Sequence, residues 1–153
     1  MLSLCIIQDT REQTPYTFAC ITPPPEVEVA TLASGDYSIK GLTDKVAVER
    51  KGLPDAFGTF GQGRARFERE LERLAQMRFA AVVIEAPWEQ IILQPPRRSK
   101  LNPKTIHASI VAWQIRYRTI HFWTCPNRVF AERTTYRLLK RFWDDLQAGK
   151  IKI

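Results

Sequence analysis

Two short apolar runs, each ending at an acidic residue, constrain the fold of this 153-residue chain most strongly. The first covers residues 2–8 and ends at Asp9, and the second covers residues 79–84 and ends at Glu85. Both are far shorter than the roughly 20 apolar residues of a membrane span, so we expect no membrane association. They are typical of buried strands, and the second predicts the central strand of an α/β sheet. Asp9 is then expected at the carboxyl edge of the first strand.

Two predicted helices lie before and after the second of these strands. A flexible, glycine-containing loop is expected at residues 58–63, and apolar residues at helical spacing then predict an amphipathic helix over residues 64–78. Asn102, followed by proline, is a good N-cap for a helix that runs to about Arg118. A strand is expected over residues 119–123. This alternation of strands and helices favours one α/β domain.

The two ends of the chain complete the expected set of elements. The three consecutive prolines of residues 23–25 predict an exposed extended loop, and the alternation in residues 26–31 is compatible with a strand. Asn127 opens a last helix, which Gly149 is expected to end. The odd number of cysteines and the absence of a CxxC pair argue against a disulfide framework or zinc site, so we expect a reduced, cytoplasmic protein.

Positive charge is concentrated in one part of the sequence. The formal net charge is +7, yet residues 97–141 hold 11 Lys or Arg and a single acid, Glu132. Aromatic residues are interleaved with this charge, as in surfaces that bind a polyanion through phosphate contacts. Solvated helix faces with the aromatics turned inward would give the same pattern. The pattern therefore suggests nucleic acid without establishing it.

A predicted hairpin brings two acidic residues and one lysine together. The turn formers of residues 41–44 separate two strand-like segments, and a symmetric register about this turn pairs Asp36 with Glu49. Paired residues share a sheet face with α-carbons about 4.5 to 5.5 Å apart, and Lys51 projects to the same face. Facing carboxylates repel each other unless a cation lies between them, and Mg²⁺ or Mn²⁺ prefers such ligands.

This constellation suits metal-dependent hydrolysis of a phosphodiester. The metal would act as a Lewis acid, and Lys51 would position the attacking water and stabilise developing charge. An exposed Asp, Glu and Lys on one hairpin face are also common as plain solvated residues.

Three sequence blocks resemble the nuclease domain of the XPF family of structure-specific endonucleases. The family signature is D-x-R-E, then G-D, then E-R-K-x-x-x-D. The chain has DTRE at residues 9–12, GD at residues 35–36 and ERKGLPD at residues 49–55, in the same order and at suitable distances. The resemblance covers the whole chain in outline. It implies a restriction-endonuclease-like α/β fold of the PD-(D/E)xK type, with a central mixed sheet flanked by helices.

The resemblance also implies a site. It implies catalytic roles for Asp9, Asp36, Glu49 and Lys51. It implies metal ligation of Mg²⁺ or Mn²⁺ by Asp36, Glu49, the Val48 carbonyl and, as an accessory acid, Asp9. It implies supporting roles, in orienting ligands or contacting the scissile phosphate, for Arg11, Glu12, Arg50 and Asp55, and a phosphate or structural contact for Arg64. Structural alternatives remain open: Asp9 could cap its strand, Arg11 and Glu12 could form a surface ion pair, and Arg50 could bridge to Asp55 or Asp9.

One departure from the family concerns DNA binding. The chain reads as a single nuclease domain over residues 1–153, with no tandem helix-hairpin-helix module behind it. Duplex binding would then fall to the basic stretch, above all to Arg97, Arg98, Lys100 and Lys104. A homodimer or an accessory protein could supply the remaining specificity.

The function expected from these observations is a metal-dependent endonuclease acting on branched, flap or fork DNA in repair or recombination. In a bacterial cell it would be nucleoid-associated. Two alternatives remain: a DNA-docking subunit that cuts nothing alone, and a less selective nuclease that acts on duplex DNA or RNA.

Overall fold

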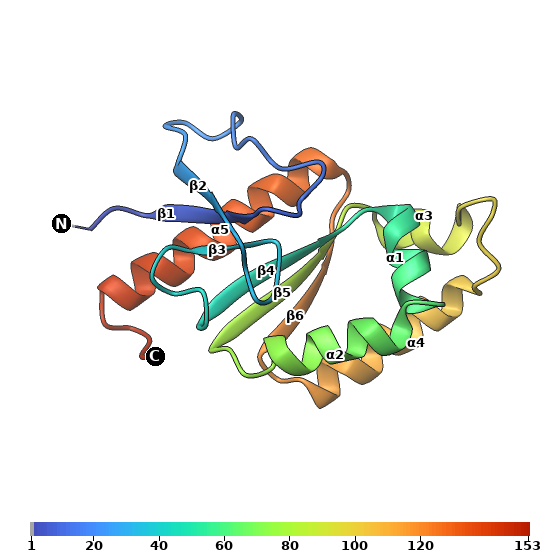
Figure 1. The fold of residues 1–153 in the computed structure, drawn as a ribbon. Coiled ribbons are helices and arrows are strands. Elements are labelled where there is room, and N and C mark those ends of the chain that lie inside the picture. Colours follow the sequence, from blue (N-terminus) through green and yellow to red (C-terminus); the bar gives the residue numbers. More distant parts are fainter. Residues whose placement is uncertain (1) are drawn as a thin grey trace.

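The computed structural model describes residues 2–153 as one mixed sheet with helices on both faces (Figure 1). The six strands lie in the order β2-β1-β3-β4-β5-β6. β3 runs antiparallel to β1 and β4, and the other neighbouring pairs are parallel. The strands are β1 (Cys5–Asp9), β2 (Glu26–Ala30), β3 (Tyr37–Ile39), β4 (Val46–Lys51), β5 (Phe79–Ile84) and β6 (Ile120–Thr124). The predicted α/β class with a central mixed sheet is confirmed.

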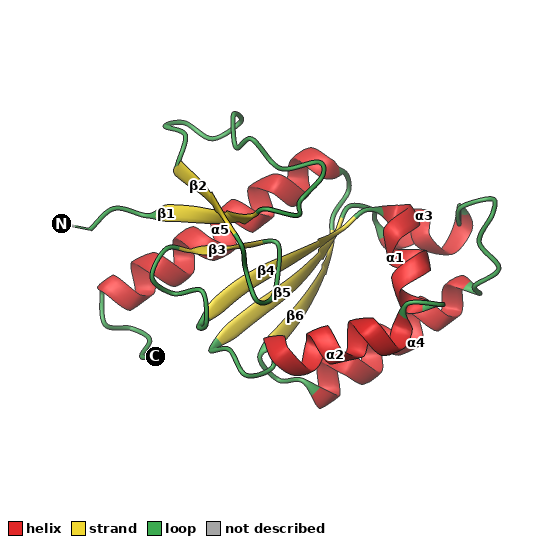
Figure 2. Ribbon diagram, viewed as in Figure 1, coloured by secondary structure: helices red, strands yellow, loops and turns green. Residues whose placement is uncertain are grey.

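Helices cover the two faces of the sheet unequally (Figure 2). The helices are α1 (Leu53–Phe60), α2 (Arg64–Leu74), α3 (Trp88–Leu93), α4 (Pro103–Arg116) and α5 (Arg128–Gln147). One core packs the first four helices against the sheet around Trp113, Phe60 and Leu71. The other packs α5 and the loop after β1 around Phe18 and Tyr37. β4 and β5 contribute buried residues to both cores, which makes them the centre of the molecule.

Local signals predicted most of these elements. The side chain of Asn102 accepts a hydrogen bond from the Lys104 amide at the start of α4, and the side chain of Asn127 accepts one from the Phe130 amide at the start of α5. α5 ends before Gly149, which has the positive φ of +70° that favours glycine. No helix of residues 2–153 is long and apolar enough to cross a membrane.

The segment around the glycines departs from the expectation. A loop was predicted for residues 58–63, but α1 extends through Gly58 to Phe60. Pro54 lies in the first turn, where its missing N–H is tolerated. Ala56, Phe57 and Phe60 are buried in the core, and this packing outweighs the cost of a helical glycine. The six-residue helix α3 was not predicted either.

Candidate active site

The β3–β4 hairpin has the register that its turn predicts. Tyr37 pairs with Val48 and Ser38 with Ala47, which is the symmetric arrangement about residues 42–43. The ladder ends there, however. The expected pairing of Asp36 with Glu49 is therefore not formed. The Asp36 amide donates instead to the Val48 carbonyl at 2.9 Å. Both carboxylates nevertheless line one cavity.

Hydrogen bonds to two strands fix the backbone of Asp36. Its amide is bonded to β4 as described, and its carbonyl accepts a hydrogen bond of 2.8 Å from the amide of Asp9 at the end of β1. The preceding Gly35 has φ of +81°, and an added Cβ would lie 2.8 Å from the Cβ of Ala47. Only glycine fits this turn, which directs Asp36 into the cavity.

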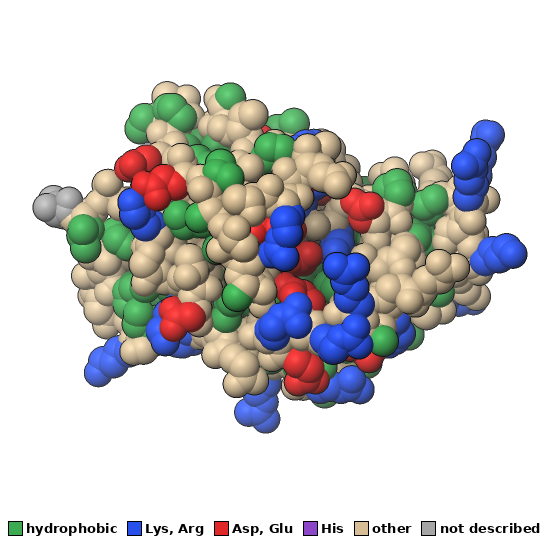
Figure 3. Space-filling view, in the orientation of Figure 1, with side chains coloured by type: hydrophobic (Ala, Val, Ile, Leu, Met, Phe, Trp, Pro, Cys, Tyr) green, Lys and Arg blue, Asp and Glu red, His purple; other side chains and the backbone are tan. Residues whose placement is uncertain are grey.

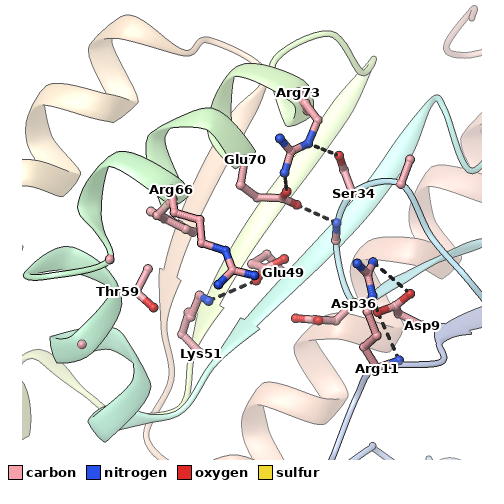
Figure 4. Close-up of a pocket in the computed structure, with 15 residues that line it drawn as sticks. Asp9, Arg11, Ser34, Asp36, Glu49, Lys51, Thr59, Arg66, Glu70 and Arg73 are labelled. Carbon is pink, nitrogen blue, oxygen red and sulfur yellow. Dashed lines mark hydrogen bonds and ion pairs between the residues drawn. The ribbon is translucent and has the colours of Figure 1, made fainter.

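The cavity has a volume of about 450 Å³ and opens between the sheet, α1 and α2 (Figure 4). Glu49 and Lys51 project into it from alternate positions of β4 and form an ion pair of 3.2 Å. The Lys51 ammonium also lies 5.2 Å from the centre of the Phe67 ring of α2. Arg66 extends from α2 toward Glu49 and Lys51. Figure 3 shows basic side chains gathered around acidic ones at this hollow.

The two central carboxyls resist ionisation in the protein alone. Burial raises the pKa of Glu49, and the charge of Asp36 raises it further. Burial also raises the pKa of Asp36, against the opposing effect of the Arg50 amide, which donates to its Oδ2 at 2.7 Å. Within residues 2–153, Lys51 is the one polar partner of the Glu49 carboxylate. A cation bound between the two carboxylates would offset their burial and their mutual repulsion.

Asp9 lines the same cavity but has partners for both of its oxygens. Arg11 Nε donates to Oδ2 at 2.9 Å, and the Leu32 amide donates to Oδ1 at 2.8 Å. Burial alone would raise the pKa of Asp9, but these hydrogen bonds outweigh it and lower the pKa. The Asp9–Arg11 pair therefore closes one wall of the cavity. The alternative of a surface ion pair between Arg11 and Glu12 is not realised, because Arg11 pairs with Asp9 and Glu12 pairs with Arg50.

Arg50 lies outside the cavity lining, in a second ionic cluster. Its guanidinium donates to Glu12 at 2.8 and 3.0 Å and to Glu85 at 2.7 Å, and so the bridge runs to these two residues instead of to Asp55 or Asp9. Tyr16 Oη adds a hydrogen bond of 2.7 Å to Glu85. We name these residues the Arg50 cluster: Glu12, Tyr16, Arg50 and Glu85. Glu12 and Arg50 contact neither of the two cavity carboxylates through their side chains.

Three other expected site residues are not part of the cavity lining. The Val48 carbonyl accepts a hydrogen bond of 2.9 Å from the Asp36 amide just beyond the ladder, so it supports the backbone of Asp36. Asp55 is exposed in the first turn of α1. Arg64 donates to Ser109 Oγ at 2.6 Å and lies over the Trp113 ring, which is a structural contact with α4.

Sequence reasoning missed the α2 side of the cavity. Arg66, Glu70 and Arg73 line it together with Ser34 from the loop before β3. Their spacing of four and three residues places them on one helical face, and this was the available signal. The prediction for this helix used only its apolar face.

The expected DNA-binding residues lie apart from the cavity. Arg97, Arg98 and Lys100 are exposed in the α3–α4 loop, at the end of the molecule beyond α1. Lys104 lines a second, open groove with Arg64 and Gly61, while Gly58 and Gly63 line the cavity. The α1–α2 turn therefore separates the two depressions. The expected interleaving of aromatics fails at Trp113 and Tyr117, which are buried.

The donor set of the cavity suits a hard divalent cation. Asp36 and Glu49 offer carboxylate oxygens, and the cavity leaves room for water as further ligands. Among residues 2–153, a group of three possible ligands with all donor atoms close together occurs elsewhere, at Cys5, Glu26 and Glu28. That group lies near the start of β1, where Lys40 already pairs with Glu28 at 2.6 Å. It is remote from Asp9, which ends the same strand.

Comparisons with known proteins agree with this geometry. The sequence model of the ERCC4 domain family matches residues 8–138, a range that includes the whole cavity. XPF from Aeropyrum pernix has a similar solved structure, with a TM-score of 0.70 and 21% sequence identity over 95% of this chain and 68% of that chain. The fold is thus restriction-endonuclease-like, as the motifs implied. The curated proteins contain no match to the sequence.

Proposed function

The chain belongs to the ERCC4 domain family and has an XPF-family nuclease domain, and from this premise we propose that it is a metal-dependent endonuclease of branched DNA. One observation carries the proposal. Two buried carboxylates and a lysine converge in a cavity whose rim is basic. Such an arrangement has no evident structural benefit, because it keeps like charges together in a poorly solvated place.

Asp36 and Glu49 are the proposed protein ligands of Mg²⁺ or Mn²⁺, and water would complete the coordination. A bound divalent ion would polarise a phosphoryl oxygen and acidify a bound water. Asp9 holds Arg11 at the cavity wall through a hydrogen bond of 2.9 Å, and to serve as an accessory acid it would have to exchange one of its present partners. The Val48 carbonyl holds the Asp36 amide in place.

Lys51 would orient the attacking water and stabilise negative charge on the phosphoryl group. Its ammonium lies beside Glu49 and over Phe67, so its position is fixed before substrate binds. In the reaction the water oxygen forms a bond to phosphorus, the bond from phosphorus to the leaving oxygen breaks, and that oxygen gains a proton. Arg66 and Arg73 on the rim would neutralise the scissile and neighbouring phosphates.

DNA would approach over the α1–α2 turn. The cavity lies on one side of this turn, and the groove with Lys104 lies on the other. Arg97, Arg98 and Lys100 extend the positive surface beyond that groove. The proposed path thus joins the two depressions, and the exposed basic loop would contact phosphates outside the cleavage site.

Cleavage of end-labelled flap, splayed-arm, duplex and single-stranded DNA with Mg²⁺ or Mn²⁺ tests the proposal. Asp36→Asn and Lys51→Ala should each abolish cutting. Asp44→Asn and Lys45→Ala are matched controls, because this exposed pair in the hairpin turn touches no cavity residue, and both should cut normally. Metal-independent cutting, or cutting that survives both site variants, would refute the assigned site.

The substrates also separate the alternatives. A preference for flap and splayed-arm DNA over duplex would support branch selectivity, whereas equal cutting of all DNA and of RNA would indicate a general nuclease. Salt-sensitive binding without any cutting would indicate a docking subunit.

A further inference from the structure

Two side chains of α2 hold the loop that carries Asp36. Glu70 Oε1 accepts a hydrogen bond of 2.8 Å from the amide of Gly35, and Arg73 Nε donates to Ser34 Oγ at 3.2 Å. Glu70 and Arg73 also form an ion pair with each other (Figure 4). The helix is therefore hydrogen-bonded to the two residues that directly precede Asp36. Neither Glu70 nor Arg73 contacts Asp36 itself.

The Gly35 amide is a sensitive point of this loop. Gly35 makes the positive-φ turn into Asp36, and its α-carbon packs closely against Ala47 of β4. The next amide, that of Asp36, is bonded to β4. Glu70 holds the preceding amide, that of Gly35, so the two peptide groups on either side of the Gly35 α-carbon are both fixed by hydrogen bonds. The φ and ψ angles of Gly35 that join them have little freedom, and the direction of the Asp36 carboxylate depends on these angles.

We propose that Glu70 is a positioning residue that sets Asp36 for metal binding through the Gly35 amide. The proposal rests on the proposed function, because it assumes that Asp36 binds the metal. Both carboxylate oxygens of Glu70 already have partners, one in Gly35 and one in Arg73, so Glu70 serves the metal indirectly. Partners that orient metal ligands typically change metal affinity about 10- to 100-fold when they are removed.

The two possible roles of Glu70 make opposite demands on its side chain. A positioning role needs an acceptor for the Gly35 amide, which glutamine also provides. A ligand or charge role needs the carboxylate, which glutamine lacks. Arg73 is 53% exposed and can turn to solvent when the charge opposite it is lost. Glu70→Gln and Glu70→Ala therefore distinguish the two roles.

The test is a calorimetric titration with Mn²⁺ in the absence of nucleic acid. Glu70→Ala should bind Mn²⁺ about 10-fold more weakly than the unmodified protein, and Glu70→Gln should stay within about 3-fold. Glu72→Ala is the matched control on the same helix, because Glu72 accepts a hydrogen bond of 2.6 Å from Tyr117 away from the cavity. It should bind Mn²⁺ normally.

Hydrogen exchange of the Gly35 amide gives a second readout that is independent of metal. Exchange should accelerate in Glu70→Ala and stay slow in Glu70→Gln, with both variants folded by thermal melting. Equal losses of Mn²⁺ affinity in the two variants would overturn the proposal, because charge would then be what matters. Unchanged Mn²⁺ affinity in Glu70→Ala would overturn the positioning role of Glu70 and leave the proposed metal site standing. An unmodified protein without Mn²⁺ affinity would overturn the metal site as well.

Discussion

Neighbouring residues of β4 belong to two ionic clusters of opposite character. Glu49 and Lys51 face the cavity, where two carboxylates share one lysine. Arg50, between them in sequence, enters the Arg50 cluster, where Glu12 and Glu85 surround it and every charge has a partner. The side chains in both clusters are largely buried, so burial alone does not distinguish them.

The difference lies in how completely the charges are compensated. In the Arg50 cluster the guanidinium satisfies two carboxylates and the Thr14 hydroxyl at distances of 2.7 to 3.0 Å. In the cavity the pKa of both Asp36 and Glu49 is raised, mainly by burial. A compensated cluster fixes the structure, while an uncompensated one is kept for binding. The same strand thus holds a compensated structural cluster and the proposed metal site one residue apart.

The largest effect is expected from breaking the compensated cluster. Arg50→Ala leaves the buried Glu12 without its cation and leaves Glu85 with only Arg128, 3.3 Å away, which should lower the free energy of unfolding by about 3 to 5 kcal/mol. Urea unfolding followed by circular dichroism measures the change. Lys45→Ala, which removes an exposed lysine next to the same strand, should change it by less than about 0.5 kcal/mol. Equal effects of the two substitutions would contradict the comparison.

A smaller effect is expected when a cation compensates the two carboxylates of the cavity. If Mn²⁺ binds the folded protein at Asp36 and Glu49, as proposed, then at 100 times its dissociation constant it should add about 2.7 kcal/mol to the free energy of unfolding. Thermal melting with Mn²⁺ and with EDTA measures this gain. Asp36→Asn should lose the gain, whereas Asp44→Asn should keep it. A gain that persists in Asp36→Asn would place the ion elsewhere, with the Cys5, Glu26 and Glu28 group as the first candidate.

The sequence predicted the features that depend on local signals. The turn of residues 41–44 set the hairpin register, and capping residues such as Asn102 and Asn127 set helix starts. The spaced motifs placed Asp9, Asp36, Glu49 and Lys51 around one cavity. Each of these signals acts over a few residues or comes from a family pattern, so it can be recognised without knowledge of how the chain packs.

The remaining features depend on long-range contacts. Arg50 meets Glu85, and Gly35 meets Glu70, in both cases 35 residues away along the chain. Local spacing carries no information about such pairs. The helix α1 was missed for a related reason, because its glycine disfavours a helix that only the core around Phe60 stabilises.

A third prediction concerns Glu49, whose charge Lys51 compensates only in part. The pKa of Glu49 is raised in the folded protein, so ionised Glu49 costs stability that develops as the pH rises from the unfolded pKa toward the folded one. Glu49→Gln removes that cost and should raise the free energy of unfolding at neutral pH by about 1 kcal/mol without metal. Cleavage should fall at least about 100-fold. Chemical unfolding in EDTA measures the stability, and a destabilised variant would mean that the carboxylate is structural.

The smallest effect is expected at the exposed basic residues of the α3–α4 loop and of the first turn of α4. Arg98 and Lys104 have no ion-pair partner within residues 2–153, and we propose that they contact phosphates. Each alanine substitution should reduce the slope of log binding constant against log salt concentration by about 1 and leave stability unchanged. Titration of labelled duplex DNA in EDTA measures the slope. Lys150→Ala is the control, because Lys150 is similarly exposed near the other end of the molecule and pairs with Asp145. An equal slope change in this control would mean that the loop has no special share in binding, and that charge anywhere on the surface suffices.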